Sequence, residues 1–143
     1  MPRKPRSEAL TDAEYRALAE FRYALRRFLA FSKSAAESAG LTPRQHQALL
    51  TIKGYPSRPR ATVGELAERL QVRHHSAVGL VDRLTELGLV IRRADTQDRR
   101  VTYVELTRRG EAKLRRLTMA HRREIRKMAP VFRTLVARIN DGG

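Results

Sequence analysis

The fold of this chain is decided by residues 61–110, ATVGELAERLQVRHHSAVGLVDRLTELGLVIRRADTQDRRVTYVELTRRG. The pattern predicts two short amphipathic helices, then two β-rich segments at 89–93 and 101–106 with a charged loop between them. This order is that of a winged helix-turn-helix, in which one helix enters the major groove of DNA and a basic loop lies beside it. We therefore predict a mainly α fold with a small β-hairpin wing.

Composition agrees with a polyanion-binding protein. The 143 residues include 30 lysines and arginines against 15 acidic residues, which gives a net charge of +15 and a pI near 11.4. Such an excess attracts nucleic acid first and an anionic membrane surface second. The absence of cysteine excludes disulfides and thiol redox sensing. No apolar run is long enough to span a bilayer, and the basic start lacks the apolar stretch of a signal peptide, so we expect a cytoplasmic protein without a membrane partner.

Threonines mark the predicted helix starts. Thr62 and Glu65 have the spacing of a capping box. Thr42 followed by Pro43 supplies a capping hydroxyl with proline at the first helical position. Thr107 is expected to cap the last long helix. These signals predict helices that begin close to residues 43, 63 and 108.

Long apolar stripes mark both ends of the chain. Apolar residues recur every three or four positions from Tyr15 to Leu29 and again from Leu114 to Ile139. Pro130 interrupts the second stripe, so we expect a kink or a break into two helices there. Neither stripe has a partner inside a small winged domain, which predicts that the long N- and C-terminal helices form the dimerisation region of a homodimer. The alternative is a monomer whose ends cover its core.

These patterns divide one domain into four segments. Residues 1–10 are expected to form a disordered basic arm. Residues 11–53 are assigned to the N-terminal dimerisation helices, residues 54–107 to a DNA-binding lobe, and residues 108–143 to the C-terminal dimerisation helices. The proline- and glycine-rich stretch 54–60 is expected to be a loop.

Residues for base recognition are expected on the N-terminal, outward side of the second lobe helix, residues 74–87. These residues are Arg73, His74, His75, Ser76 and Gly79. An arginine can pair bidentately with guanine, and a serine can bond to either base of a pair. We therefore predict that this helix reads a palindromic double-stranded DNA operator.

Two residues of this helix have alternative explanations. Glycine inside a helix costs about 1 kcal/mol relative to alanine, so Gly79 indicates either close approach to DNA or tight packing of the helix. Arg83 lies one turn further on and is expected to reach a phosphate. Its alternative role is a local ion pair with Asp82 or Glu86.

The charged loop 92–100 is the predicted wing. It holds four arginines and two aspartates, and an arginine on a protruding hairpin fits the negative potential of a narrow minor groove. An aspartate in a DNA-binding loop is unfavourable by itself, because its carboxylate and the DNA phosphates are both negative. Asp98 is two residues from Arg100, and at this spacing its carboxylate can orient the Arg100 side chain. Asp98, Arg99 and Arg100 are therefore the candidate wing contacts, against the alternative of a generic charged turn.

The sequence resembles the MarR (multiple antibiotic resistance regulator) family from about residue 15 to residue 139. Residues 98–110, DRRVTYVELTRRG, are similar to its wing and following helix start. Residues 80–84, LVDRL, followed by Gly88, resemble the end of its recognition helix, and residues 41–45, LTPRQ, resemble its second helix. The resemblance implies a dimeric winged-helix transcription regulator, usually a repressor, with intertwined end helices. By position, Arg100 matches the family's minor-groove arginine and Asp98 its orienting carboxylate.

The resemblance also implies a ligand site between the dimerisation helices and the DNA-binding lobe. Our candidates are Tyr15, Phe31, His46 and Leu114, and the implied effector is a small aromatic acid or another anion. A junction that is packed solid is the alternative. The chain departs from the family's peroxide-sensing branch because it has no cysteine. It also has Gly79 where a larger polar or basic residue is frequent, so base preference cannot be transferred.

No catalytic constellation is present in the sequence, so we expect neither an enzyme nor a cofactor. A metal site would require His46 and His121 to meet, and two ordinary partly buried histidines are the favoured interpretation. The alternative function is a sequence-tolerant, architectural DNA-coating protein, which the high charge also supports. A specific regulator differs from it by a large gap between operator and random-DNA affinity.

Overall fold

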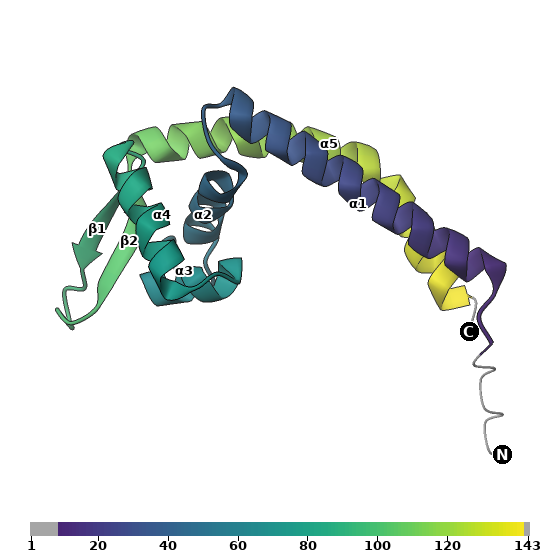
Figure 1. The fold of residues 1–143 in the computed structure, drawn as a ribbon, viewed down its shortest axis with the longest axis horizontal. Coiled ribbons are helices and arrows are strands. Elements are labelled where there is room, and N and C mark those ends of the chain that lie inside the picture. Colours follow the sequence, from purple (N-terminus) through teal and green to yellow (C-terminus); the bar gives the residue numbers. More distant parts are fainter. Residues whose placement is uncertain (1–8, 142–143) are drawn as a thin grey trace, which may run out of the picture. The chain divides into compact units, whose positions relative to one another are not determined.

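A computed structural model describes residues 9–141 and contains five helices and a β-hairpin (Figure 1). The elements are α1 Asp12–Ser38, α2 Pro43–Lys53, α3 Val63–Leu70, α4 His74–Glu86, β1 Val90–Ala94, β2 Thr102–Leu106 and α5 Arg108–Asp141. Two compact units are present. We call residues 33–119 the lobe, and residues 9–32 with 120–141 the helical arm. Residues 1–8, most of the predicted basic arm, lie outside the described part of the chain.

A capping box is present at the N-terminus of α2 and at that of α3. The Thr62 hydroxyl accepts from the Glu65 amide at 3.1 Å, and the Glu65 carboxylate accepts from the Thr62 amide at 2.8 Å, as predicted. Thr42 and Gln45 form the same reciprocal pair ahead of α2. Each box satisfies two backbone groups that a helix end leaves without partners, which fixes where the helix begins.

The β-hairpin has a third, short partner. β1 and β2 pair antiparallel, with Val90 opposite Leu106 at the base and Ala94 opposite Thr102 near the loop. Ala61, directly before α3, exchanges backbone hydrogen bonds with Val104 at 3.1 and 2.7 Å. The segment between α2 and α3 is therefore a loop that ends in a strand-like contact, and this contact ties the loop to the hairpin.

The lobe is built on one hydrophobic core. α2 contributes to this core and packs against α3, α4 and β2, although the sequence grouped it with the terminal helices. The fully buried side chains with the largest volumes come from α2, α3, α4 and the hairpin: Leu49, Ile52, Leu66, Leu84, Leu89, Val81, Val90 and Val104. Complete burial of a leucine or valine contributes about 1.5–3 kcal/mol, so this core holds the helices and the hairpin in fixed relation.

Two glycines allow close connections between the hairpin and the helices on either side of it, α4 and α5. Gly88 follows α4 with a φ of +72°, a left-handed conformation that costs glycine little. Gly110, in the first turn of α5, lies against the Leu89 backbone, and a Cβ at this position would be 2.0 Å from the Leu89 carbonyl oxygen. The Thr107 hydroxyl accepts from the Gly110 amide at 3.1 Å, so the predicted cap of this helix is confirmed.

The helical arm is an antiparallel pair of helix segments. The Phe21 ring packs edge-on against Phe132 with centroids 5.6 Å apart, and the Phe28 ring packs against His121 at 5.9 Å. His121 Nε2 is also 2.8 Å from the Ser32 hydroxyl. The contact residue on α1 with the higher number, Phe28, meets the one on α5 with the lower number, His121, so the two helix segments are antiparallel (Figure 1).

α5 continues through Pro130 as one helix, so the break expected at this proline does not occur. Proline inside a helix costs about 3 kcal/mol because it removes one backbone hydrogen bond. Phe132 packs on Phe21 and Leu135 is buried just beyond the proline. These contacts hold the following turns in helical register and offset that cost. Among the described residues, none of the helices combines the length and apolar content that crossing a bilayer requires.

Candidate nucleic-acid interface

The start of α4 is exposed and carries no side-chain cap. Arg73 occupies the N-cap position without a capping hydrogen bond from its side chain. Arg73, His74 and His75 are exposed, and Ser76 is half-buried. The amides of the first helical turn therefore keep their hydrogen-bonding capacity beside three side chains that can donate hydrogen bonds. Such a helix start can approach an anion or the edge of a base pair.

Gly79 faces open space. Apart from Gly79, its two chain neighbours and the adjacent backbone of α4, no heavy atom of the described residues lies within 4 Å of the position that a Cβ would occupy. Packing within this chain therefore does not require glycine, which removes the tight-packing explanation. Glycine at this position destabilises the helix by about 1 kcal/mol relative to alanine, and it leaves the backbone on the outward side of α4 uncovered by a side chain.

Arg83 adopts the local pairing that the sequence left as an alternative. Its Nη1 donates to Glu86 Oε2 at 3.1 Å, and both side chains are about two-thirds exposed. An exposed pair of this kind contributes only about 0–1 kcal/mol. The pairing therefore does not prevent Arg83 from exchanging a carboxylate for a phosphate.

The wing loop brings Asp98 and Arg100 together. The guanidinium of Arg100 donates from Nε to Asp98 Oδ1 at 3.1 Å and from Nη2 to Oδ2 at 3.3 Å, and the Arg100 amide donates to Oδ1 at 3.1 Å. The hydrogen bonds from Arg100 lower the pKa of Asp98 below its ordinary value. The carboxylate thus fixes the direction of a side chain that remains 91% exposed.

Sequence reasoning missed that two other arginines of the hairpin, Arg92 and Arg93, are paired with acids. Arg92 donates to Asp82 on α4 at 2.5 Å, and Arg93 pairs with Glu105 across the hairpin. The Asp82 contact joins the wing to α4. The Arg93 pair is diagonal across the hairpin, because Arg93 is opposite Tyr103 and Glu105 is two residues further along β2. Diagonal neighbours on one face are within reach of long side chains, and this spacing could have indicated the pair. Arg99 is exposed at the tip.

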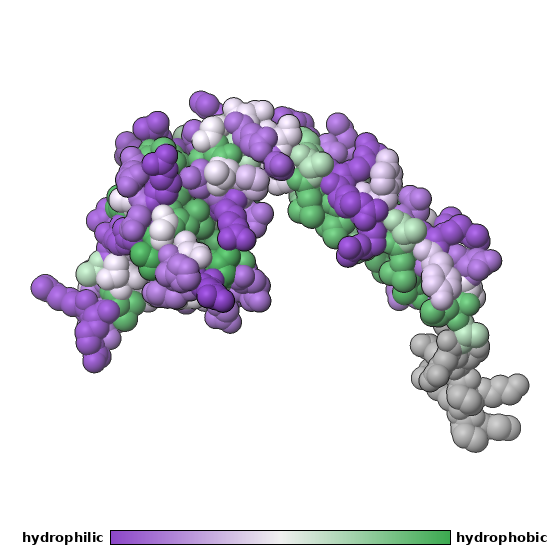
Figure 2. All heavy atoms as spheres, viewed as in Figure 1, coloured by the Kyte–Doolittle hydropathy of each residue, from purple (hydrophilic) through white to green (hydrophobic). Residues whose placement is uncertain are grey.

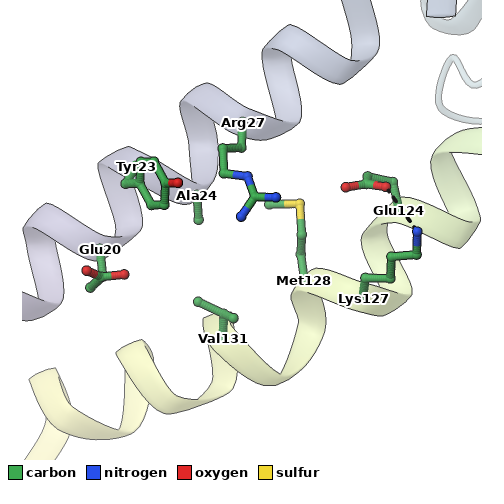
Figure 3. A pocket seen from close by; sticks show the side chains of 8 residues that line it. All are labelled: Glu20, Tyr23, Ala24, Arg27, Glu124, Lys127, Met128 and Val131. Atoms are coloured by element: carbon green, nitrogen blue, oxygen red, sulfur yellow. Dashed lines mark ion pairs between the residues drawn. The ribbon is translucent and has the colours of Figure 1, made fainter.

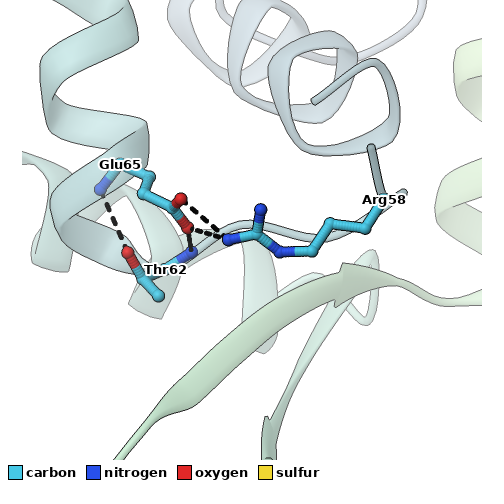
Figure 4. A network of polar contacts seen from close by, with 3 residues as sticks. All are labelled: Arg58, Thr62 and Glu65. Carbon is cyan, nitrogen blue, oxygen red and sulfur yellow. Dashed lines mark hydrogen bonds and ion pairs between the residues drawn. The ribbon is translucent and has the colours of Figure 1, made fainter. Parts of the chain in front are cut away.

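A half-buried arginine organises the loop before α3 (Figure 4). Arg58 Nη2 donates to both Glu65 oxygens at 2.6 and 2.7 Å, and each side chain is about a quarter exposed. Burial by itself raises the pKa of Glu65. Hydrogen bonds from the Thr62 amide, the Tyr55 hydroxyl and Arg58 outweigh it and lower that pKa to about 2. The capping carboxylate of α3 thereby also anchors the loop.

The four candidate ligand residues do not form one pocket within a chain. Tyr15 and Phe31 lie in the helical arm on the same helix, and sixteen residues at 1.5 Å each separate them by about 24 Å. Tyr15 is 61% exposed. Phe31 packs edge-on against His121. His46 and Leu114 are buried in the lobe.

The helical arm has a groove that the sequence did not indicate (Figure 3). Its volume is about 230 Å³. The side chains that line it combine an aromatic ring, two cations and two carboxylates with apolar groups, and they are Glu20, Tyr23, Ala24, Arg27, Glu124, Lys127, Met128 and Val131. Arg27 lies 5.7 Å from the Tyr23 ring centroid, and Lys127 lies 3.9 Å from Glu124.

The metal interpretation of the histidines gains no support. No group of three or more potential ligands from histidine, cysteine, aspartate or glutamate is present among residues 9–141. His121 is surrounded by Phe28, Phe31 and Ser32, which explains its burial by packing.

Known proteins share this architecture. The sequence profile of the MarR family matches residues 39–101. The HTH-type transcriptional repressor MdtR of Bacillus subtilis is 36% identical over 77 residues, which cover 54% of this chain and 48% of MdtR. This chain therefore matches about half the length of that curated relative.

Two solved structures superpose over most of the chain. RV1404 from Mycobacterium tuberculosis has a TM-score of 0.70 at 23% identity and covers 94% of this chain and 97% of its own. An S. aureus MepR mutant bound to an oligodeoxyribonucleotide has a TM-score of 0.65 at 20% identity and covers 85% and 84%. At such identities the likeness shows the fold.

The segment 39–101 therefore resembles the MarR family. The matched segment contains α2, α3, α4, β1 and the wing loop. β2 and the start of α5, which also carried the resemblance in the sequence, lie beyond it. The predicted winged helix-turn-helix with long terminal helices is confirmed.

Proposed function

We propose that this protein is a homodimeric, sequence-specific DNA-binding transcription regulator that acts as a repressor. Two features together carry the proposal. The start of α4 is exposed and has no side-chain cap, and the wing holds an arginine, Arg100, that is oriented by Asp98. α4 would enter the major groove, and the wing would place Arg99 and Arg100 in the adjacent minor groove. The repressor name of the Bacillus subtilis relative MdtR supports this direction of regulation.

The contacts have distinct proposed roles. Arg73, His74, His75 and Ser76 would read base edges, with Gly79 allowing the helix backbone to lie close to the DNA. Arg83 would hold a phosphate. The bound oligodeoxyribonucleotide of the MepR mutant supports DNA as the partner, and the net charge of +15 supplies the electrostatic attraction.

Dimerisation is supported by apolar surface on the helical arm. In Figure 2 apolar side chains follow its paired helices. Leu18 and Leu29 on α1 and Ile125 and Val136 on α5 are each more than 50% exposed. Two helices alone cannot cover such stripes, and an apolar patch of this kind marks an interaction site. A second copy presents the same stripes, so a two-fold interface buries both sets.

The test of sequence-specific regulation compares two affinities at one salt concentration. Duplexes selected by the protein from a random library should bind about 10³-fold or more tightly than mixed-sequence DNA. Equal affinity for both would contradict the proposal and would favour the architectural, DNA-coating function instead.

The test of dimerisation uses two matched substitutions on α1. Leu18→Glu places a charge in the proposed interface and should weaken the dimer about 100-fold or more, because an unpaired charge would be buried. Ala19→Glu adds the same charge at a neighbouring exposed position and should have little effect. Analytical ultracentrifugation measures both. A wild-type protein that sediments as a monomer at micromolar concentration would contradict the proposal.

Control by a small aromatic or anionic effector is a finer proposal. The groove of the helical arm supports it, because Arg27 lies 5.7 Å from the Tyr23 ring centroid and Lys127 lines the same groove. Salicylate should release operator DNA at constant ionic strength, and Ala24→Phe, which fills the groove, should abolish release. Equal release by chloride and salicylate would contradict effector control.

A further inference from the structure

The loop between α2 and α3 brings two arginines to one tyrosine ring. The guanidinium carbons of Arg58 and Arg60 lie 4.8 and 4.2 Å from the centroid of the Tyr103 ring on β2. The negative face of an aromatic ring attracts a cation at this distance. Tyr103 therefore holds both guanidinium groups beside the hairpin.

The charges of the two arginines are balanced differently. Arg58 is neutralised by its two short hydrogen bonds to Glu65. Within the described part of the chain, no carboxylate lies within ion-pair distance of Arg60. Arg60 is half-buried, so its position is restricted while part of its surface still meets solvent. It is a positioned cation without an internal counter-charge.

Backbone pairing places this cation beside the wing. Ala61, the next residue, is hydrogen-bonded to Val104 in both directions. Tyr103 precedes Val104 and is only three residues from Arg100 at the wing tip, which limits the separation of their Cα atoms to about 10 Å. A duplex carries one phosphate charge for about every 1.7 Å of its axis. DNA that meets the wing tip therefore also presents phosphates within reach of the hairpin flank.

We propose that Arg60 is an additional DNA contact that binds a backbone phosphate next to the wing, with Tyr103 as its positioning residue. The inference rests on the proposed DNA-binding function and adds a residue to it. A phosphate contact fixes the position of a protein on DNA and carries no direct sequence information. The contribution of Arg60 is therefore the same on every duplex, unlike that of the α4 residues.

The experiment measures affinity against salt concentration for a selected operator duplex and for a mixed-sequence duplex. Arg60→Ala should lower both affinities by the same factor, about five- to tenfold, and should reduce the slope of log K against log salt by about 0.9. Arg60→Lys keeps the charge and should retain the slope. It should recover the affinity only in part, because lysine lacks the planar group that stacks on the ring.

Tyr103 is tested by a double-mutant cycle. Tyr103→Leu should weaken binding, and Arg60→Ala should then cost less than it does in the wild type, because the ring no longer positions the arginine. Thermal melting of each variant shows whether the lobe remains folded, and Arg60→Lys provides the test if Tyr103→Leu does not fold. Arg123→Ala, an exposed arginine of the helical arm, is the charge-matched control and should leave the slope unchanged.

Three results would overturn the inference, and they are distinguishable. If the wild type binds DNA and Arg60→Ala matches Arg123→Ala in slope and affinity, Arg60 does not contact phosphate although the proposed function stands. If the wild type binds neither duplex, the proposed function fails and the inference fails with it. A loss confined to the operator duplex would contradict the phosphate contact, because it would indicate base reading.

Discussion

Replacing Glu65 by glutamine should destabilise the lobe in a pH-dependent way. Glu65 accepts hydrogen bonds from Thr62 and Arg58 and is about a quarter exposed. Glutamine can still accept from the Thr62 amide, but it removes the negative charge that faces Arg58. The variant therefore isolates the contribution of the carboxylate charge from that of the helix cap.

The magnitude follows from the pKa of Glu65, which is lowered from 4.5 to about 2. A shift of this size corresponds to roughly 3 kcal/mol of stability. Solvent reaches part of the pair and screens it, so we expect about 2 kcal/mol for Glu65→Gln at pH 7. Because the folded pKa is below the unfolded one, this stabilisation is complete above pH 4.5 and is lost as the pH falls toward 2.

The assay is urea unfolding followed by circular dichroism at pH 7, 5, 4 and 3. The difference in unfolding free energy between wild type and Glu65→Gln should be constant from pH 7 to 5 and should shrink below pH 4.5. The control is Glu111→Gln, which breaks the exposed Lys53–Glu111 pair and should cost at most about 0.5 kcal/mol. A Glu65→Gln cost equal to that of the control, or one that does not change with pH, would refute the reasoning.

Three further substitutions test other parts of the chain. Gly79→Ala should raise the free energy of unfolding by about 1 kcal/mol and weaken operator binding in a gel-shift assay; tighter binding would contradict close approach of α4. Gly110→Ala should cost about 3 kcal/mol or more in chemical unfolding, because its Cβ would lie 2.0 Å from the Leu89 carbonyl oxygen, and unchanged stability would disprove that contact. Asp98→Ala should weaken operator binding although it removes a negative charge, and a gain in affinity would eliminate the orienting role.

Three predictions that depended on local sequence agree with the structure. The Thr62–Glu65 box, the hydroxyl of Thr107 and the glycine after α4 each act over a few residues, so their consequences can be read without the fold. The wing was predictable for the same reason, since Asp98 and Arg100 are two residues apart and meet within one turn. The assignment of these residues to DNA contacts remains a prediction.

Contacts between distant segments were decided only by the tertiary structure. The stacking of Arg58 and Arg60 on Tyr103, the pairing of Ala61 with Val104 and the fit of Gly110 against Leu89 have no local signal. Each joins segments whose separation in the chain is set by how the core packs.

At Pro130 a local sequence signal was present, and the tertiary structure overrode it. Its local effect predicted a break, but packing on both sides of it keeps α5 continuous. The sequence by itself therefore determined the elements and their order, because capping, periodicity and turn chemistry are local. The tertiary structure determined which arginines are neutralised and which remain available to a partner, because ion pairing depends on distances that only the packed core sets.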